Sequence, residues 1–139
     1  MADVTVKRID EMDSLFAGMF VRARGELGVT AWGMQVINLP ANWNDHFDHA
    51  HAGMPYEVAN DGQEEVYVAR RGSATLRAGD EPYALDPGVM IRVGPGEIRK
   101  IVTGDEPVQI LAIGGTPGQA YKPPPFTEVG TPPPPAPAG

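Results

Sequence analysis

Three histidines lie close together in the stretch DHFDHAHAGMPYEVANDGQEEVYV, which spans residues 45–68. They are His46, His49 and His51, and the chain has no other histidine. On an extended chain His49 and His51 point to the same side, because side-chain direction alternates with period two. Two imidazoles at this spacing can bind one metal ion. His46 is three positions from His49 and faces away, so we interpret it as a solvated loop residue.

Glu65 is the candidate third ligand, at the start of the apolar run EVYVARRG. A carboxylate from a neighbouring strand completes a two-histidine, one-carboxylate set, which suits iron(II), and nickel, manganese or zinc also bind imidazole–carboxylate sites. Period two places Tyr67 on the Glu65 side of this run, where its hydroxyl is a candidate ligand contact. The residues therefore predict a divalent-metal site formed by His49, His51 and Glu65.

The elements that must position these residues are short strands. The chain contains 17 glycines and 15 prolines, which interrupt it too often for long helices. Runs rich in β-branched and aromatic residues alternate with turn signals. The expected strands cover residues 20–25, 30–39, 65–70, 73–78, 83–85, 89–93, 99–102 and 108–113. No helical crossover separates them, so the pattern predicts an all-β fold, an antiparallel sandwich or barrel.

The two ends of the chain differ from this strand-rich middle. Apolar residues at helical spacing predict a short helix over residues 10–19. After Gly115 the sequence is rich in proline and ends in TPPPPAPAG, which favours polyproline II and predicts a flexible tail whose first part lies across the barrel. We therefore expect an N-terminal extension (1–24), a barrel (25–115) and a proline-rich tail (116–139).

Composition limits the classes of partner. The chain has 18 acidic against 11 basic residues, whereas nucleic-acid-binding domains usually carry a basic surface. It has no cysteine, which excludes disulfides, thiolate metal sites and a cysteine nucleophile. The charged N-terminus lacks the apolar core of a signal peptide, and no run reaches the about 18 apolar residues of a membrane span. We expect a cytoplasmic protein with neither a nucleic-acid nor a membrane partner.

The spacing of glutamate, glycine and proline resembles the cupin superfamily, in its small single-domain form. The first cupin motif is G-x5-H-x-H-x3-4-E-x6-G. Its last part, E-x6-G, matches Glu65 to Gly72. The second, G-x5-P-x-G-x2-H-x3-N, is matched in its glycines from Gly88 to Gly96. The resemblance covers roughly residues 29–115. It implies a double-stranded β-helix (jelly-roll barrel), commonly a homodimer, with a cavity near the metal position.

The chain departs from both motifs at informative positions. Arg99 stands where the second motif has its last metal-binding histidine, and Thr103 stands where it has asparagine. Trp43 stands at the leading glycine of the first motif. A guanidinium is always charged and opposes a divalent ion in the same pocket. Arg99 could instead pair with Glu65 in the space that a metal would fill, or lie at the surface.

Two alignments of the histidines remain open. Thirteen residues separate His51 from Glu65, where the family has three or four. In the first alignment His49 and His51 are the motif pair, and the extra residues form a lid-like loop. In the second the loop has the family's length, so Val58 and Asn60 take the ligand positions and no metal binds. We prefer the first, because the histidine pair follows LPANWND, where a strand-to-turn transition is expected.

These residues suggest three functions, among which the fold does not choose. The one we favour is binding of a small anionic or carbonyl-bearing molecule by Glu65, Tyr67 and Arg99, beside a degenerate metal site. The alternative is a metal-dependent enzyme of the dioxygenase or isomerase type, with His49, His51 and Glu65 as ligands. The third is a structural or regulatory dimer that meets a partner through its proline-rich tail.

Overall fold

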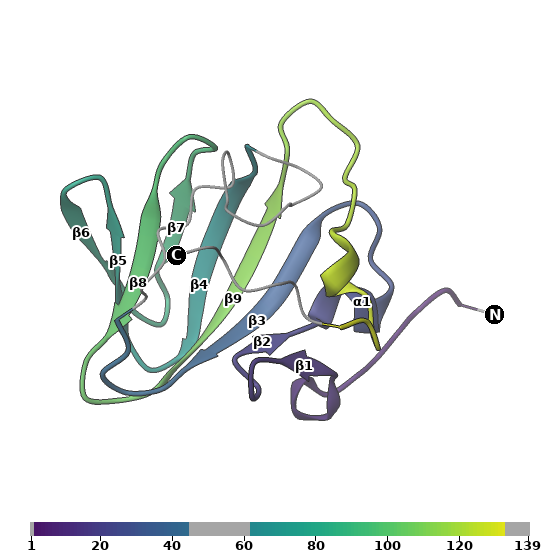
Figure 1. The fold of residues 1–139 in the computed structure, drawn as a ribbon, viewed down its shortest axis with the longest axis horizontal. Coiled ribbons are helices and arrows are strands. Elements are labelled where there is room, and N and C mark those ends of the chain that lie inside the picture. The colour runs from purple at the N-terminus through teal and green to yellow at the C-terminus, as the bar shows by residue number, and fades with distance from the viewer. Residues whose placement is uncertain (1, 45–61, 133–139) are drawn as a thin grey trace.

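The computed structural model describes residues 2–44 and 62–132, and these residues form two antiparallel sheets (Figure 1). The larger sheet has the strand order β1-β2-β3-β9-β4-β7, and the smaller has the order β6-β5-β8. The strands are β1 (Ser14–Leu15), β2 (Phe20–Val21), β3 (Gly33–Leu39), β4 (Glu64–Arg71), β5 (Ala74–Ala78), β6 (Glu81–Leu85), β7 (Met90–Val93), β8 (Arg99–Thr103) and β9 (Val108–Gly115). Every pair of hydrogen-bonded neighbours among them is antiparallel.

The strands from β3 onward lie close to the ranges expected from the sequence. Short runs rich in β-branched and aromatic residues, between glycine- and proline-containing turns, predicted these strands with shifts of no more than three residues at either end. The all-β, antiparallel prediction is therefore confirmed.

The expected N-terminal helical turn is confirmed, but it does not extend over residues 10–19. A single 3-10 turn, Ile9–Glu11, is followed by the hairpin of β1 and β2. Phe16 and Ala17, between these strands, have φ angles of 54° and 55°, in the left-handed region that a right-handed helix excludes. The apolar spacing that indicated a helix belongs to a tight hairpin.

The sequence predicted one strand over residues 20–25. The structure has the short strand β2 there, followed by helix α1 (Ala23–Leu27). It ends at Gly28, whose φ of 75° forms a left-handed cap. The glycine after Leu27 was a signal for this short helix that the strand interpretation overlooked. None of the helices in the described parts of the chain is long and apolar enough to cross a membrane.

Apolar side chains form two clusters, one on each face of the larger sheet. The main cluster lies between the two sheets and contains the fully buried Leu76, Leu85 and Ile110. The second is formed by Val36 on the other face of β3, together with Val21 and Ala23 of the N-terminal segment. Met34 packs against this second cluster, whereas Trp32 is 46% exposed.

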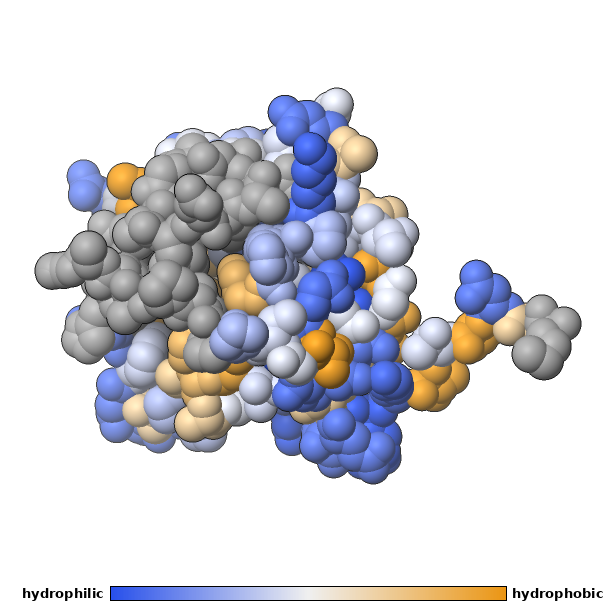
Figure 2. Space-filling model, turned by 45° about the vertical axis from the view of Figure 1, so that its right-hand side comes forward, coloured by the Kyte–Doolittle hydropathy of each residue, from blue (hydrophilic) through white to orange (hydrophobic). Residues whose placement is uncertain are grey.

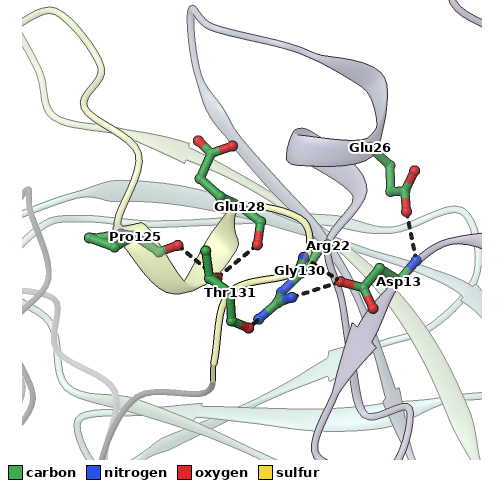
Figure 3. Close-up of polar contacts among 7 residues, drawn as sticks. All are labelled: Asp13, Arg22, Glu26, Pro125, Glu128, Gly130 and Thr131. Atoms are coloured by element: carbon green, nitrogen blue, oxygen red, sulfur yellow. Dashed lines mark hydrogen bonds and ion pairs between the residues drawn. The ribbon is translucent and has the colours of Figure 1, made fainter.

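The segment after β9, residues 116–132, folds back over the N-terminal elements, and we call it the C-terminal strap. Figure 3 shows its last residues beside Arg22 and Asp13. The Gly130 N–H and an Arg22 Nη1–H both donate to Asp13 Oδ2, at 3.1 and 2.7 Å, and Arg22 Nη2 also donates to the Thr131 carbonyl. Backbone and side-chain contacts thus hold the strap in place.

Further contacts of the strap involve α1 and β2. Arg24 Nη2 lies 2.6 Å from Glu128 Oε1, and the Arg24 side chain is buried. The rings of Phe20 and Phe126 pack with their centroids 5.6 Å apart. Gly25 allows close approach, because a Cβ there would lie 2.7 Å from the Thr127 carbonyl oxygen. These contacts agree with the expectation that the first part of the tail lies across the folded body.

Asp13 makes the attachment of the strap sensitive to acid. The Gly130 N–H and then Arg22 hold the pKa of Asp13 below its ordinary value. A carboxyl group whose pKa falls on folding contributes stability above its unfolded pKa and loses it as the pH falls through the folded pKa. We therefore expect Asp13→Asn to cost about 1 kcal/mol at pH 7, discounted for the partly exposed carboxylate. Urea unfolding from pH 7 to pH 2 should show this difference shrinking with acid; a constant difference would contradict the account.

The first residues of the chain form an arm that projects from the body (Figure 2). Val4 and Val6 in this arm are 72% and 88% exposed. Exposed aliphatic side chains gain free energy when an intermolecular contact buries them. The homodimer expected from the cupin resemblance stays a prediction, and this arm is one place where it can be tested.

Candidate functional site

Glu65, Tyr67 and Arg99 meet between the two sheets. Glu65 and Tyr67 are two residues apart on β4, so both side chains point to the inner face. Arg99 is the first residue of β8 in the smaller sheet, and its side chain also points inward. The three residues are 4%, 5% and 1% exposed, respectively. The structure thus brings together the three residues that we considered as ligand contacts.

An ion pair and two hydrogen bonds connect these side chains. Arg99 Nη2 donates to Glu65 Oε1 at 2.9 Å, and the Tyr67 hydroxyl donates to the same oxygen. Arg99 Nε lies 3.4 Å from the Tyr67 hydroxyl oxygen. We call Glu65, Tyr67 and Arg99 the inner polar cluster. Its positive and negative charges balance within it.

The turn between β7 and β8 fixes the other side of the guanidinium. Arg99 Nη1 donates to the carbonyl oxygens of Gly94 and Glu97, at 3.2 and 2.7 Å. Four of the five guanidinium N–H groups therefore have acceptors, and the orientation of Arg99 is set from both sides. The glycine-rich turn of the second cupin motif here binds a side chain, in addition to reversing the chain.

Burial determines the protonation state of Tyr67. Burial and then the charge of Glu65 raise the pKa of Tyr67 well above its ordinary value, so the hydroxyl keeps its proton and donates to the carboxylate. For Arg99, burial opposes the charge, but Tyr67 and Glu65 outweigh it and raise the pKa of the guanidinium. Arg99 therefore stays positively charged.

The histidine candidates lie outside the described residues. This holds for His46, His49 and His51, and also for Val58 and Asn60 of the second alignment. The surface position considered for Arg99 is not what the structure shows, since Arg99 is buried against Glu65.

Trp43 and Thr103, which both replace motif residues, contact each other. The Trp43 N–H donates to Thr103 Oγ1 at 2.7 Å, and the Thr103 N–H donates to the Trp43 carbonyl at 2.9 Å. Thr103 Oγ1 in turn donates to the Pro40 carbonyl at 2.6 Å. These bonds attach the segment just before residue 45 to β8, so the two departures have a structural role.

Gln63 is an inner-face residue that the sequence reasoning overlooked. It is two positions before Glu65 and only 5% exposed. The alternation that identified Tyr67 from Glu65 also indicates Gln63, because residues i−2 and i+2 of a strand share a face.

No protein-family model and no curated protein sequence matches the chain. Solved structures do match. A cupin protein from Bacteroides fragilis superposes with a TM-score of 0.66, covering 88% of this chain and 93% of its own, at 22% identity. The chain has the cupin fold. The expected jelly-roll architecture is thereby confirmed. The residues of this chain can now be compared with the metal site that the cupin fold implies.

Two other proteins with the cupin fold are named for activities. A sugar phosphate isomerase of the cupin superfamily from Silicibacter pomeroyi superposes with a TM-score of 0.61 at 17% identity, covering 79% of this chain and 74% of its own. A DMSP lyase from Ruegeria pomeroyi has a TM-score of 0.51 at 24% identity, covering 66% of this chain but only 42% of the lyase. At these identities the likeness establishes the fold alone.

Arg99 opposes the binding of a divalent metal ion at Glu65 in the described part of the site. Over residues 2–44 and 62–132, no group of three histidine, cysteine, aspartate or glutamate side chains could hold an ion. Arg99 has no lone pair to offer, and its charge lies 2.9 Å from the one carboxylate that would be a ligand. An ion next to Glu65 would meet a fixed positive charge.

Proposed function

We propose that this cupin binds a small molecule without a metal, and that the Arg99–Glu65 pair takes the place of the metal centre. The observation that carries the proposal is the 2.9 Å ion pair between Arg99 and Glu65, whose side chains are 1% and 5% exposed. The guanidinium supplies a fixed positive charge next to a carboxylate, where a metalloprotein would place its ion.

A role in binding explains why charges are kept in this interior. Moving two charges out of water is costly, and well-packed apolar residues often stabilise a protein as much or more. Interiors that keep polar groups despite this cost are candidates for functional sites. The cluster lies on the inner face beside the apolar core, an environment typical of small-molecule sites.

The charge balance of the cluster indicates the chemistry of the ligand. Glu65 already neutralises Arg99, so the site offers little net attraction to an anion. Among the described residues, four of the five guanidinium N–H groups have acceptors, and we propose that the fifth donates to a ligand oxygen. We therefore propose a neutral ligand that bears carbonyl or hydroxyl oxygens, and drop the anionic ligand.

Saturation-transfer NMR tests this function. The full chain, kept in EDTA, is presented with dihydroxyacetone, D-xylose, D-glucose and myo-inositol. We expect at least one of them to bind, and Tyr67→Phe to weaken that binding about tenfold, because one hydrogen bond that orients Glu65 and Arg99 is lost. Binding that appears only after iron, nickel, manganese or zinc is added would overturn the proposal in favour of the metal-dependent enzyme.

A further inference from the structure

Two glycines lie beside Glu65 on the inner face of the larger sheet. Gly33 of β3 pairs directly with Gly114 of β9, and Gly114 pairs with Glu65 of β4. Directly paired residues on antiparallel strands project to the same face. Because neither glycine has a side chain, neighbouring side chains pack closely against this floor of the sheet, next to the carboxylate of the inner polar cluster.

Three polar side chains surround this floor. The Tyr121 hydroxyl oxygen lies 2.9 Å from the position that a Cβ on Gly33 would take. Gln63 Oε1 lies 3.3 Å from the corresponding position on Gly114, and the Cγ of Glu65 lies 2.9 Å from it. Tyr121 belongs to the C-terminal strap, so a residue distant in sequence completes this part of the inner face.

Tyr121 and Gln63 lack the hydrogen bonds that such positions normally have. Within residues 2–44 and 62–132, neither the Tyr121 hydroxyl nor the Gln63 amide has a hydrogen-bond partner. Gln63 is only 5% exposed, and polar side chains at such positions usually have a hydrogen-bond partner. Burial raises the pKa of Tyr121, so its hydroxyl remains a donor. Two uncharged groups therefore point to one small region, and among the described residues neither has a hydrogen-bond partner.

We propose that Tyr121 and Gln63, above Gly33 and Gly114, form a second part of the ligand site that binds hydroxyl groups of a neutral polyol or sugar. The inference rests on the proposed function and names its ligand class. A hydroxyl group both donates and accepts, as do a phenol and a primary amide. An anionic group gains little here, because Glu65 already neutralises the nearby charge of Arg99.

The strap supplies the Tyr121 hydroxyl and holds it in place. The Arg24–Glu128 ion pair at 2.6 Å and the Phe20–Phe126 contact fix the strap a few residues after Tyr121. A side chain held in one orientation loses little conformational freedom when a ligand binds. The strap is thus part of the binding site.

Variants of the two residues test the proposal against matched controls. Saturation-transfer NMR in EDTA would compare the wild type with Tyr121→Phe and Gln63→Leu, using D-xylose, D-glucose and myo-inositol as probes and D-gluconate as the charged counterpart. Tyr83→Phe is the control, since Tyr83 is 47% exposed on β6. We expect the neutral probes to bind about tenfold more weakly to both variants and equally to the control.

The outcomes separate this inference from the proposed function. If neutral probes bind and lose affinity in Tyr67→Phe but not in Tyr121→Phe or Gln63→Leu, the second part of the site is wrong and the proposed function stands. If D-gluconate binds and the neutral probes do not, the ligand class is wrong. If none of the four binds without metal, the second part of the site is wrong, and the proposed function is overturned as well unless dihydroxyacetone binds. Each variant is compared at a temperature well below its own midpoint of unfolding.

Discussion

Arg99→Met is expected to lower the free energy of unfolding by about 3–5 kcal/mol, because breaking a buried ion pair leaves an uncompensated charge. Methionine keeps much of the length of the side chain but none of its donors. The variant would leave the Glu65 carboxylate without the guanidinium at 2.9 Å, and the Gly94 and Glu97 carbonyls without their donor. Urea unfolding of the full chain at pH 7 measures the loss.

Two further variants distinguish the effect of losing the Arg99–Glu65 ion pair from the effect of replacing any arginine on a β-strand. Arg77→Met changes an exposed arginine on β5 and should alter the stability by no more than about 0.5 kcal/mol. Arg99→Met combined with Glu65→Gln removes both charges, and we expect it to be more stable than Arg99→Met alone. If the double variant is no more stable than the single one, the loss of stability in Arg99→Met does not come from an unpaired, buried Glu65 carboxylate.

Gly72→Ala is expected to cost about 3 kcal/mol or more, through a backbone clash at the end of the first cupin motif. Gly72 has a φ of 73°, which strains any residue with a Cβ. A Cβ there would lie 2.2 Å from the Pro107 carbonyl oxygen, which is backbone and has little room to move. Thermal and urea unfolding should both show the loss.

Gly79→Ala is the matched control for this variant. Gly79 has a φ of 60°, but nothing lies within 4 Å of a Cβ built there. Its substitution should cost only the strain of the left-handed backbone, about 1–2 kcal/mol. Equal costs at the two positions would show that the approach of Pro107 is not the reason why this motif position holds glycine.

Elements set by local chemistry were predictable from the sequence. The strands from β3 to β9 follow runs of β-branched residues between turn residues, and the fold class follows from their number and spacing. The N-terminal hairpin was not predictable in this way, because nothing in the residue types of Phe16 and Ala17 requires their left-handed backbone. The spacing of apolar residues alone cannot distinguish such a hairpin from a helix.

The site was predictable only where it depends on alternation along one strand. Period two placed Glu65 and Tyr67 on one face, and the second cupin motif directed attention to Arg99. The contribution of Tyr121 depends on the path of the strap, and the pairing of Gly33 with Gly114 depends on the register of β3 against β9. These contacts join residues about 80 or more positions apart, for which the sequence carries no local signal.

The metal content of the full chain, purified without chelators, tests the central claim most directly. Because Arg99 is bound to Glu65, we predict much less than one equivalent of iron, nickel, manganese or zinc per chain, and the same low content in His46→Ala, His49→Ala and His51→Ala. Close to one equivalent in the wild type, lost in His49→Ala and His51→Ala but kept in His46→Ala, would contradict the claim and establish the histidine pair with Glu65 as a metal site.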